Sequence, residues 1–194
     1  MGRPSRKDEL LAAGIAVLHR QGYAGSSVDA IVEEAGMQKG SFFGHFGSKE
    51  AFASEALKGY FNGWTANAEA ILANTELNNL GKLEALVRIS TPGDCEDYGY
   101  GCLIGNLAAE MSMRHDDVRN TLVDILAEWA RPFAQLVREG VASGEFRAGL
   151  EPEATARFLI NALQGSVLRG KVDRTTEPYE DFLSLASTLL LADV

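Results

Sequence analysis

Polar and basic side chains gather near the amino terminus, between Gln38 and His45. An amide such as that of Gln38 can pair with a base edge, and an ammonium such as that of Lys39 can pair with a phosphate. Phe42 and Phe46 lie four residues apart, which predicts that both rings pin a short helix to the core. The side chains left for the other face are Gln38, Lys39, Ser41, Phe43 and His45. This segment therefore predicts a face that could read DNA.

A helix this short needs neighbouring elements to hold it, because an isolated helix of about 12–15 residues is already marginal in water. Ahead of it, Ser27 can cap a helix and Asp29 stands where the helix dipole favours negative charge. Gly36 can take the positive φ that ends that helix, and Ser48 can cap the next one. Two short helices joined by a tight turn containing glycine predict a helix-turn-helix.

A further helix is expected from about Arg6 to Gln21, and a short basic arm with Arg3, Arg6 and Lys7 precedes or opens it. Arms of this kind can reach phosphates or a minor groove. The alternative for the arm is an ordinary solvated terminus.

With this arm and helix ahead of it, the segment GYAGSSVDAIVEEAGMQKGSFFGHFGSKEAF resembles the DNA-binding domain of TetR-family transcriptional regulators. The resemblance is specific over residues 6–55 and architectural beyond them. It implies an all-α homodimer in which residues 1–48 bind double-stranded operator DNA, while residues 49–194 bind a small effector and dimerise. By position, the resemblance assigns DNA contact to Ser27, Gln38, Lys39, Gly40, Ser41, Phe43, His45 and Lys49.

Three positions depart from the family's usual pattern. The family usually has tyrosine at Phe43 and serine or threonine at Gln38, and the pair Gly44-His45 is atypical. The missing tyrosine hydroxyl removes one expected phosphate contact. The departures bear on how bases are read and leave the expected binding mode unchanged.

The charge of the chain is unevenly distributed. The net charge is -9, yet residues 1–49 hold 6 Lys and Arg against 5 Asp and Glu, a net charge of +1. The remaining residues hold 12 basic and 22 acidic side chains, a net charge of -10. A DNA-reading face needs local positive charge and not a basic whole protein. The acidic remainder predicts weak non-specific DNA binding.

Several classes of protein are disfavoured by composition. No run approaches the roughly 18 apolar residues of a membrane span. The charged amino terminus lacks a signal-peptide core, which predicts a cytoplasmic protein. The two cysteines, Cys95 and Cys102, make no disulfide framework, and neither metal-ligand spacing nor a cofactor motif is found.

The rest of the chain reads as helices without strand alternation or repeats. Helical spacing of apolar residues predicts helices over residues 49–72, 81–90, 102–113, 116–143, 152–169 and 178–192. Pro132 is expected to kink the fourth of these, and Pro152 to lie in the first turn of the fifth.

The last two predicted helices are unusually apolar for a chain end. The alternatives are burial inside one chain and pairing with the same helices of a second copy, and the family resemblance favours the second. The residues predicted for this dimer interface are Phe158, Ala162, Leu163, Phe182, Leu185 and Leu189.

Cys102 follows a glycine-rich segment and opens a predicted helix, where free amides and the helix dipole favour thiolate. Lys171 could add positive charge if the fold brings it close. GCLIGNLAAE and GKVDR together are similar to a TetR subgroup whose members sense thiol-reactive electrophiles or bind acrylate-like molecules. The alternative is that Cys102 is a small buried apolar residue. The acidic neighbours of Cys95 make it the poorer nucleophile.

The walls of an effector pocket can be predicted only by residue type, as apolar or aromatic side chains with some polar groups. The candidates are Trp64, Tyr98, Tyr100, Met111 and Trp129, each of which could instead be ordinary core. A thiol enzyme using Cys102 is a second function class, although only His115 could serve as its base. A helical protein-interaction module that binds no DNA is a third.

Overall fold

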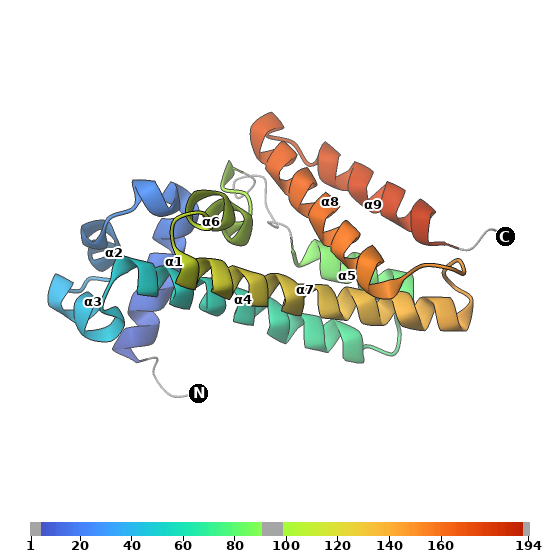
Figure 1. Ribbon diagram of the computed structural model, residues 1–194, viewed down its shortest axis with the longest axis horizontal. Coiled ribbons are helices and arrows are strands. Elements are labelled where there is room, and N and C mark those ends of the chain that lie inside the picture. Colours follow the sequence, from blue (N-terminus) through green and yellow to red (C-terminus); the bar gives the residue numbers. More distant parts are fainter. Residues whose placement is uncertain (1–4, 91–98, 192–194) are drawn as a thin grey trace. The chain divides into compact units, whose positions relative to one another are not determined.

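The computed structural model describes residues 5–90 and 99–191 (Figure 1). These residues form nine α-helices, and the only strand-like pairing among them is an isolated antiparallel bridge between Phe146 and Leu191. The predicted all-α class is confirmed. None of the described helices combines the length and apolar character that crossing a membrane requires.

The first helix, α1 (Arg6–Gly25), begins at a capping box. The Ser5 hydroxyl accepts from the Asp8 amide, and the Asp8 carboxylate accepts from the Ser5 amide. Regular helical backbone is interrupted at Gly22, where φ is 70° and ψ is 178°. Only glycine visits this region without strain, so the predicted end at Gln21 matches a real change of direction.

Helices α2 (Val28–Glu34) and α3 (Lys39–Phe46) form the predicted helix-turn-helix. Ser27 caps α2 by accepting from the Ala30 amide at 3.0 Å. Gly36 takes the expected positive φ, at 61°. The hydroxyl of Ser48 then accepts from Ala51 in the first turn of α4 (Lys49–Ala73).

Two helices have different bounds from those predicted. Helix α5 (Asn79–Arg88) begins earlier than Gly81, because the side chain of Asn78 accepts from the Gly81 amide and caps it. Helix α6 (Leu103–Met111) is shorter at both ends than predicted, so Cys102 immediately precedes it.

The three carboxy-terminal helices are α7 (Asp116–Ser143), α8 (Pro152–Asp173) and α9 (Glu177–Leu190). Helix α7 has the predicted bounds and is one helix through Pro132. Helix α8 has Pro152 at its start, as expected, and runs past Arg169 until Arg174 takes the left-handed conformation. The apolar faces of α8 and α9 pack against each other.

The chain divides into two compact units. The first unit comprises Met1–Gly63 with Leu103–Ile125, and the second comprises Trp64–Cys102 with Leu126–Val194. In the first unit α6 packs against α1. Two of the three boundaries along the chain fall inside α4 and α7, and the third lies between Cys102 and Leu103, at the start of α6. The division of residues 1–48 from residues 49–194 concerns function and stays a prediction.

Candidate nucleic-acid interface and effector site

The recognition-helix candidate α3 is held by its aromatic side chains. Phe42 is fully buried and Phe46 is 7% exposed. Both rings contact Phe52 of α4, with centroid distances of 5.1 and 4.9 Å. The predicted inward face of this short helix is therefore correct, and burial of these rings supplies the stability that eight residues lack by themselves.

The opposite side of α3 is open. We define the α3 outer face as the exposed residues Gln38, Lys39, Gly40, Phe43 and His45. Gln38 occupies the cap position but its side chain makes no capping bond, which leaves the amide available. Phe43 is 49% exposed and packs one edge on Phe42. Ser41 is half-buried, and its hydroxyl lies 3.9 Å from the Met37 sulfur.

Lys39 forms an ion pair with Asp29 of α2, with 2.8 Å between Nζ and Oδ2. Both side chains are more than half exposed. Such exposed pairs contribute about 0–1 kcal/mol, so Lys39 can exchange this partner for a phosphate at little cost. Ser27 and Arg6 are also exposed, whereas Arg3 lies outside the described residues.

Lys49 differs from the expectation that it faces DNA. Its ammonium donates to the carbonyl oxygens of Tyr23 and Ser26, both at 2.6 Å, and lies 4.1 Å from the centre of the Tyr23 ring. Burial lowers the pKa of Lys49, against the opposing effect of the carboxylates of Glu50 and Glu110. In this conformation Lys49 joins α4 to the end of α1 and does not reach outward.

Glu110 of α6 contacts the same turn. We call this turn, residues 22–26, together with Lys49, Glu50 and Glu110 that bind it, the α1–α2 corner. The carboxylate of Glu110 accepts from the amides of Tyr23, at 3.2 Å, and Ala24, at 2.8 Å. A Cβ added at Gly22 would lie 2.4 Å from its Oε1. Tyr23 in turn donates its hydroxyl to Glu50 at 2.8 Å. Neither Glu110 nor Tyr23 is predicted from the sequence, although the glycine before Tyr23 was the available signal.

The residues predicted to line an effector pocket are distributed over both units. Trp64 and Trp129 meet edge to face at 5.9 Å, and the indole of Trp64 donates to the Ser90 hydroxyl at 2.8 Å. Both belong to the second unit, whereas the fully buried Met111 belongs to the first. Cys102 is 6% exposed, so its thiol is largely hidden.

The effector prediction contains three more residues, of which Tyr100 and Lys171 belong to the second unit. Tyr100 and Lys171 are half-buried, and Tyr98 lies outside the described residues, as does Cys95. No group of three or more His, Cys, Asp or Glu side chains in residues 5–90 and 99–191 is arranged to hold a metal ion.

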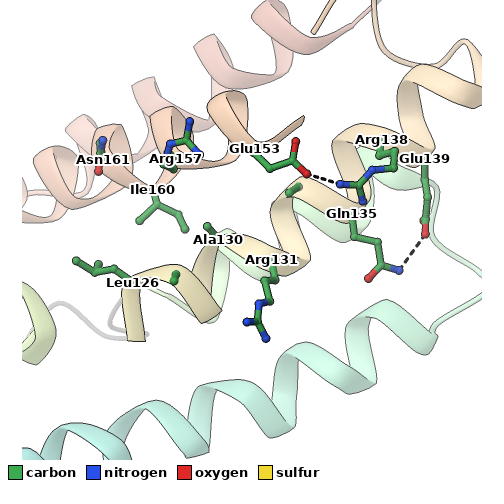
Figure 2. A pocket seen from close by; sticks show the side chains of 12 residues that line it. Leu126, Ala130, Arg131, Gln135, Arg138, Glu139, Glu153, Arg157, Ile160 and Asn161 are labelled. Atoms are coloured by element: carbon green, nitrogen blue, oxygen red, sulfur yellow. Dashed lines mark hydrogen bonds and ion pairs between the residues drawn. The ribbon is translucent and has the colours of Figure 1, made fainter. Parts of the chain in front are cut away.

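A groove of about 850 Å³ lies between α7 and α8 in the second unit (Figure 2). Its floor includes Leu126, Ala130, Ala134 and Ile160, and the ion pair of Arg138 with Glu153 bridges the two helices. None of the predicted effector residues that the structure describes lines this groove. The sequence signal for it was alanine at 127, 130 and 134, which places small side chains at helical spacing along α7.

The predicted dimer-interface residues divide into two sets. Leu163 is fully buried and Phe182 is 7% exposed, both within a single chain. Ala162 is half-buried. Phe158, Leu185 and Leu189 are exposed by 57%, 62% and 44%. For Leu163 and Phe182 the alternative of burial inside one chain describes the structure, because both side chains are already buried in the single chain.

Comparison with known proteins places the helix-turn-helix in its family. Residues 10–56 match the model described as bacterial regulatory proteins, tetR family. Residues 80–186 match the tetracyclin repressor-like C-terminal domain. The chain belongs to the TetR family of transcriptional regulators. The resemblance in the amino-terminal sequence is thereby confirmed, and it extends well beyond residue 55.

Two relatives are similar in sequence to most of this chain. The chain is 35% identical over 192 residues to the HTH-type transcriptional repressor DhaR of Mycobacterium sp. strain GP1, covering 98% of this chain and 95% of that protein. It is 33% identical over 175 residues to the transcriptional regulator AcuR of Cereibacter sphaeroides, covering 89% and 80%.

A solved structure confirms the fold. The regulatory protein TetR from Rhodobacter sphaeroides aligns with a TM-score of 0.88 and 30% identity, covering 95% of this chain and 98% of that one. The chain is therefore a DNA-binding regulator with the TetR-family fold. Membership of this family favours a regulator over the thiol enzyme and the protein-interaction module.

Proposed function

We propose that the chain is a repressor that holds an operator as a homodimer and releases it when a small molecule binds. The observation that carries this proposal is the α3 outer face. Its polar and basic side chains are exposed while Phe42 and Phe46 fix the helix from behind. A helix mounted in this way can enter a major groove with its first residues toward the bases.

Within this proposal, Gln38 and Lys39 have different roles. The unbonded amide of Gln38 suits a base edge, whereas Lys39 suits a phosphate. Lys49 is reassigned to holding the α1–α2 corner, since both carbonyl contacts would have to break before its ammonium reached DNA. The repressor sign is supported by the family and by the relative DhaR, which is described as a repressor.

The dimer is supported by the outer side of the last two helices. Large apolar side chains there remain exposed in the single chain, at Phe158, Leu168, Val172, Leu185 and Leu189. Several large exposed apolar side chains on two helices that pack together are typical of an interface. A dimer would present two copies of α3, and half-sites about 34–36 Å apart, or a multiple of this, would match its two-fold symmetry.

The test is gel shift of the purified dimer on DNA upstream of its own reading frame, at several salt concentrations. Gln38→Ala should lose about 1–3 kcal/mol on the operator and little on random DNA. Lys39→Ala should weaken both alike and flatten the salt dependence by about 0.9 in log–log slope for each phosphate that is no longer neutralised. Arg119→Ala, which removes an exposed cation of α7, is the control. Equal losses on operator and random DNA for Gln38→Ala would contradict the base contact.

A thiol-reactive electrophile or an unsaturated carbonyl compound is one candidate effector, supported by the position of Cys102 directly before α6. With only 6% of Cys102 exposed, reaction would require local opening. The measurement is operator release by N-ethylmaleimide from the parent and from Cys102→Ser. Release from the parent alone supports Cys102 as the sensor. Equal release from both would mean that the reagent acts at another nucleophile, such as Cys95, and that Cys102 is not the sensor.

A further inference from the structure

The groove between α7 and α8 contains two donor side chains with no partner. Arg157 and Asn161 line it, and neither side chain makes a hydrogen bond or ion pair with any other described residue. They lie four residues apart on α8, so they are neighbours on one face of the helix. Together they offer a guanidinium and an amide to one acceptor group.

The other charged groups of the groove already have hydrogen-bond partners. Glu153 accepts from Arg138, and Glu139 accepts from the Gln135 amide at 2.9 Å. Arg131 donates to Glu128 at 2.7 Å, and Figure 2 shows it pointing away from α8. Glu139 keeps its negative charge, because Gln135 is neutral, but its carboxylate already accepts a hydrogen bond. Among the described lining residues, the unused hydrogen-bonding groups are therefore the donors of Arg157 and Asn161. Unused donors, one of them a cation, favour an anionic acceptor over a cation.

Beside these donors the lining of the groove is apolar. Ala127, Ala130 and Ala134 form a strip of small side chains along α7, with Leu126 at one end. Ile160 points from α8 toward this strip (Figure 2). Seven residues separate the first alanine from the last, so the strip is about 10 Å long at about 1.5 Å per residue. An extended chain of about eight carbons would cover it.

We propose that this groove binds an amphipathic monoanion, a carboxylate on an extended or flat apolar body. The carboxylate lies at Arg157 and Asn161, where a charge-assisted and often bidentate bond is available. The apolar body lies along the alanine strip and against Ile160. The proposal deepens the proposed function by naming a chemical class of effector, and it rests on that function only for the link to operator release.

Isothermal titration calorimetry of the full-length protein without DNA tests the binding. The probes are octanoate, octan-1-ol and octyltrimethylammonium, which share the apolar chain and differ in the charge of the head. Octanoate should bind saturably, once per chain, and at least tenfold more tightly than octan-1-ol. Octyltrimethylammonium should bind more weakly still. Equal affinity for octanoate and octan-1-ol, or no saturable binding of octanoate, would overturn the proposal.

Two variants locate the site. Arg157→Gln should weaken octanoate at least tenfold and leave octan-1-ol unchanged, while Arg119→Gln, on α7 outside the groove, should change neither. Ala130→Leu keeps a helix-forming residue but fills the strip, so it should abolish binding of both probes. Octanoate binding that is insensitive to Arg157→Gln and Ala130→Leu would place the ligand elsewhere and overturn the assignment.

Gel shift with octanoate then separates this proposal from the proposed function. If the parent protein never binds operator, the proposed function fails, while the calorimetric result for the groove still stands. If operator binding is normal and octanoate is not bound, the groove proposal fails by itself.

Discussion

The two compact units differ in how many large apolar side chains they leave exposed. In the described residues of the first unit, three large apolar side chains are exposed, at Phe43, Met113 and Val123. The second unit exposes seven, and five of them lie on α8 and α9. A monomeric surface with this many neighbouring apolar groups is unusual. The comparison shows that the first unit covers nearly all of its large apolar side chains by itself, whereas the second leaves a set exposed that our proposed dimer would cover.

Polar groups show the same contrast. At the α1–α2 corner, Glu110 occupies the amides of Tyr23 and Ala24, and Lys49 occupies two carbonyls. In the groove of the second unit, Arg157 and Asn161 have no partner among the described residues. A unit that must hold α3 in one orientation benefits from closed polar contacts. A unit that receives a ligand and a second copy, as we propose for the second unit, needs open ones.

The largest predicted effect separates the inner and outer sides of the last two helices. Leu163→Asp buries a charge without a partner and removes a fully buried side chain, so it should cost more than about 4 kcal/mol and unfold the second unit. Leu185→Asp changes a side chain that is 62% exposed, so helical content should persist while the dimer dissociates. Circular dichroism and analytical ultracentrifugation measure the two properties separately.

Either of two results would contradict the predicted difference between the inner and outer sides of these helices. A folded Leu163→Asp protein would mean that α8 does not need its inner face. A Leu185→Asp protein that stays dimeric and still binds operator would move the interface away from the outer face of α9.

A smaller effect is expected at the α1–α2 corner. Gly22→Ala places a side chain where φ is 70° and ψ is 178°, which costs about 1–3 kcal/mol in backbone strain alone. It also pushes against Glu110, because the new Cβ would lie 2.4 Å from Oε1. Urea unfolding should therefore show a clear loss of stability, accompanied by weaker operator binding.

The matched control is Gly63→Ala in α4, where an added Cβ meets nothing within 4 Å. That change should raise the free energy of unfolding by about 0.5–1 kcal/mol. The double variant Gly22→Ala with Glu110→Ala isolates the contact, since removing the carboxylate relieves the clash but not the backbone strain. Strictly additive losses would show that Glu110 does not press on this position.

The elements were more predictable from sequence than the contacts between them. Ser27, Gly36 and Ser48 mark helix ends through local hydrogen bonds and backbone preference, which depend on a few neighbouring residues. The role of Lys49 was missed because its partners lie 23 and 26 residues away, on a turn whose direction the sequence does not reveal. The groove could not be predicted because it depends on how α7 and α8 lie against each other. The alanine spacing on α7 does not reveal that arrangement.

The smallest predicted effect concerns acid stability at the same corner. The ionised carboxylate of Glu50 is stabilised first by its own backbone amide and then by the Tyr23 hydroxyl. These hydrogen bonds hold the pKa of Glu50 below the ordinary value near 4.5, although burial opposes the shift. Burial and this hydrogen bond also raise the pKa of Tyr23 above its usual range, so the phenol stays protonated and keeps donating. The contact is partly exposed, so its contribution to stability is reduced by solvent screening.

The sign of the pH dependence follows from linkage. Above about pH 4.5 the Glu50 carboxyl is ionised in both states and its full stabilisation is present. As the pH falls below this value, the unfolded chain takes up the proton first, so the stabilisation is lost until the folded carboxyl is protonated as well. Unfolding by urea at a series of pH values should show a shallower acid decline for Glu50→Gln than for the parent. Glu33→Gln, at an exposed carboxylate of α2, controls for removing a charge, and an equal change in both variants would mean that the Tyr23 contact contributes nothing specific. A difference confined to Glu50→Gln would show that the hydrogen bond between Tyr23 and Glu50 persists in solution and stabilises the corner.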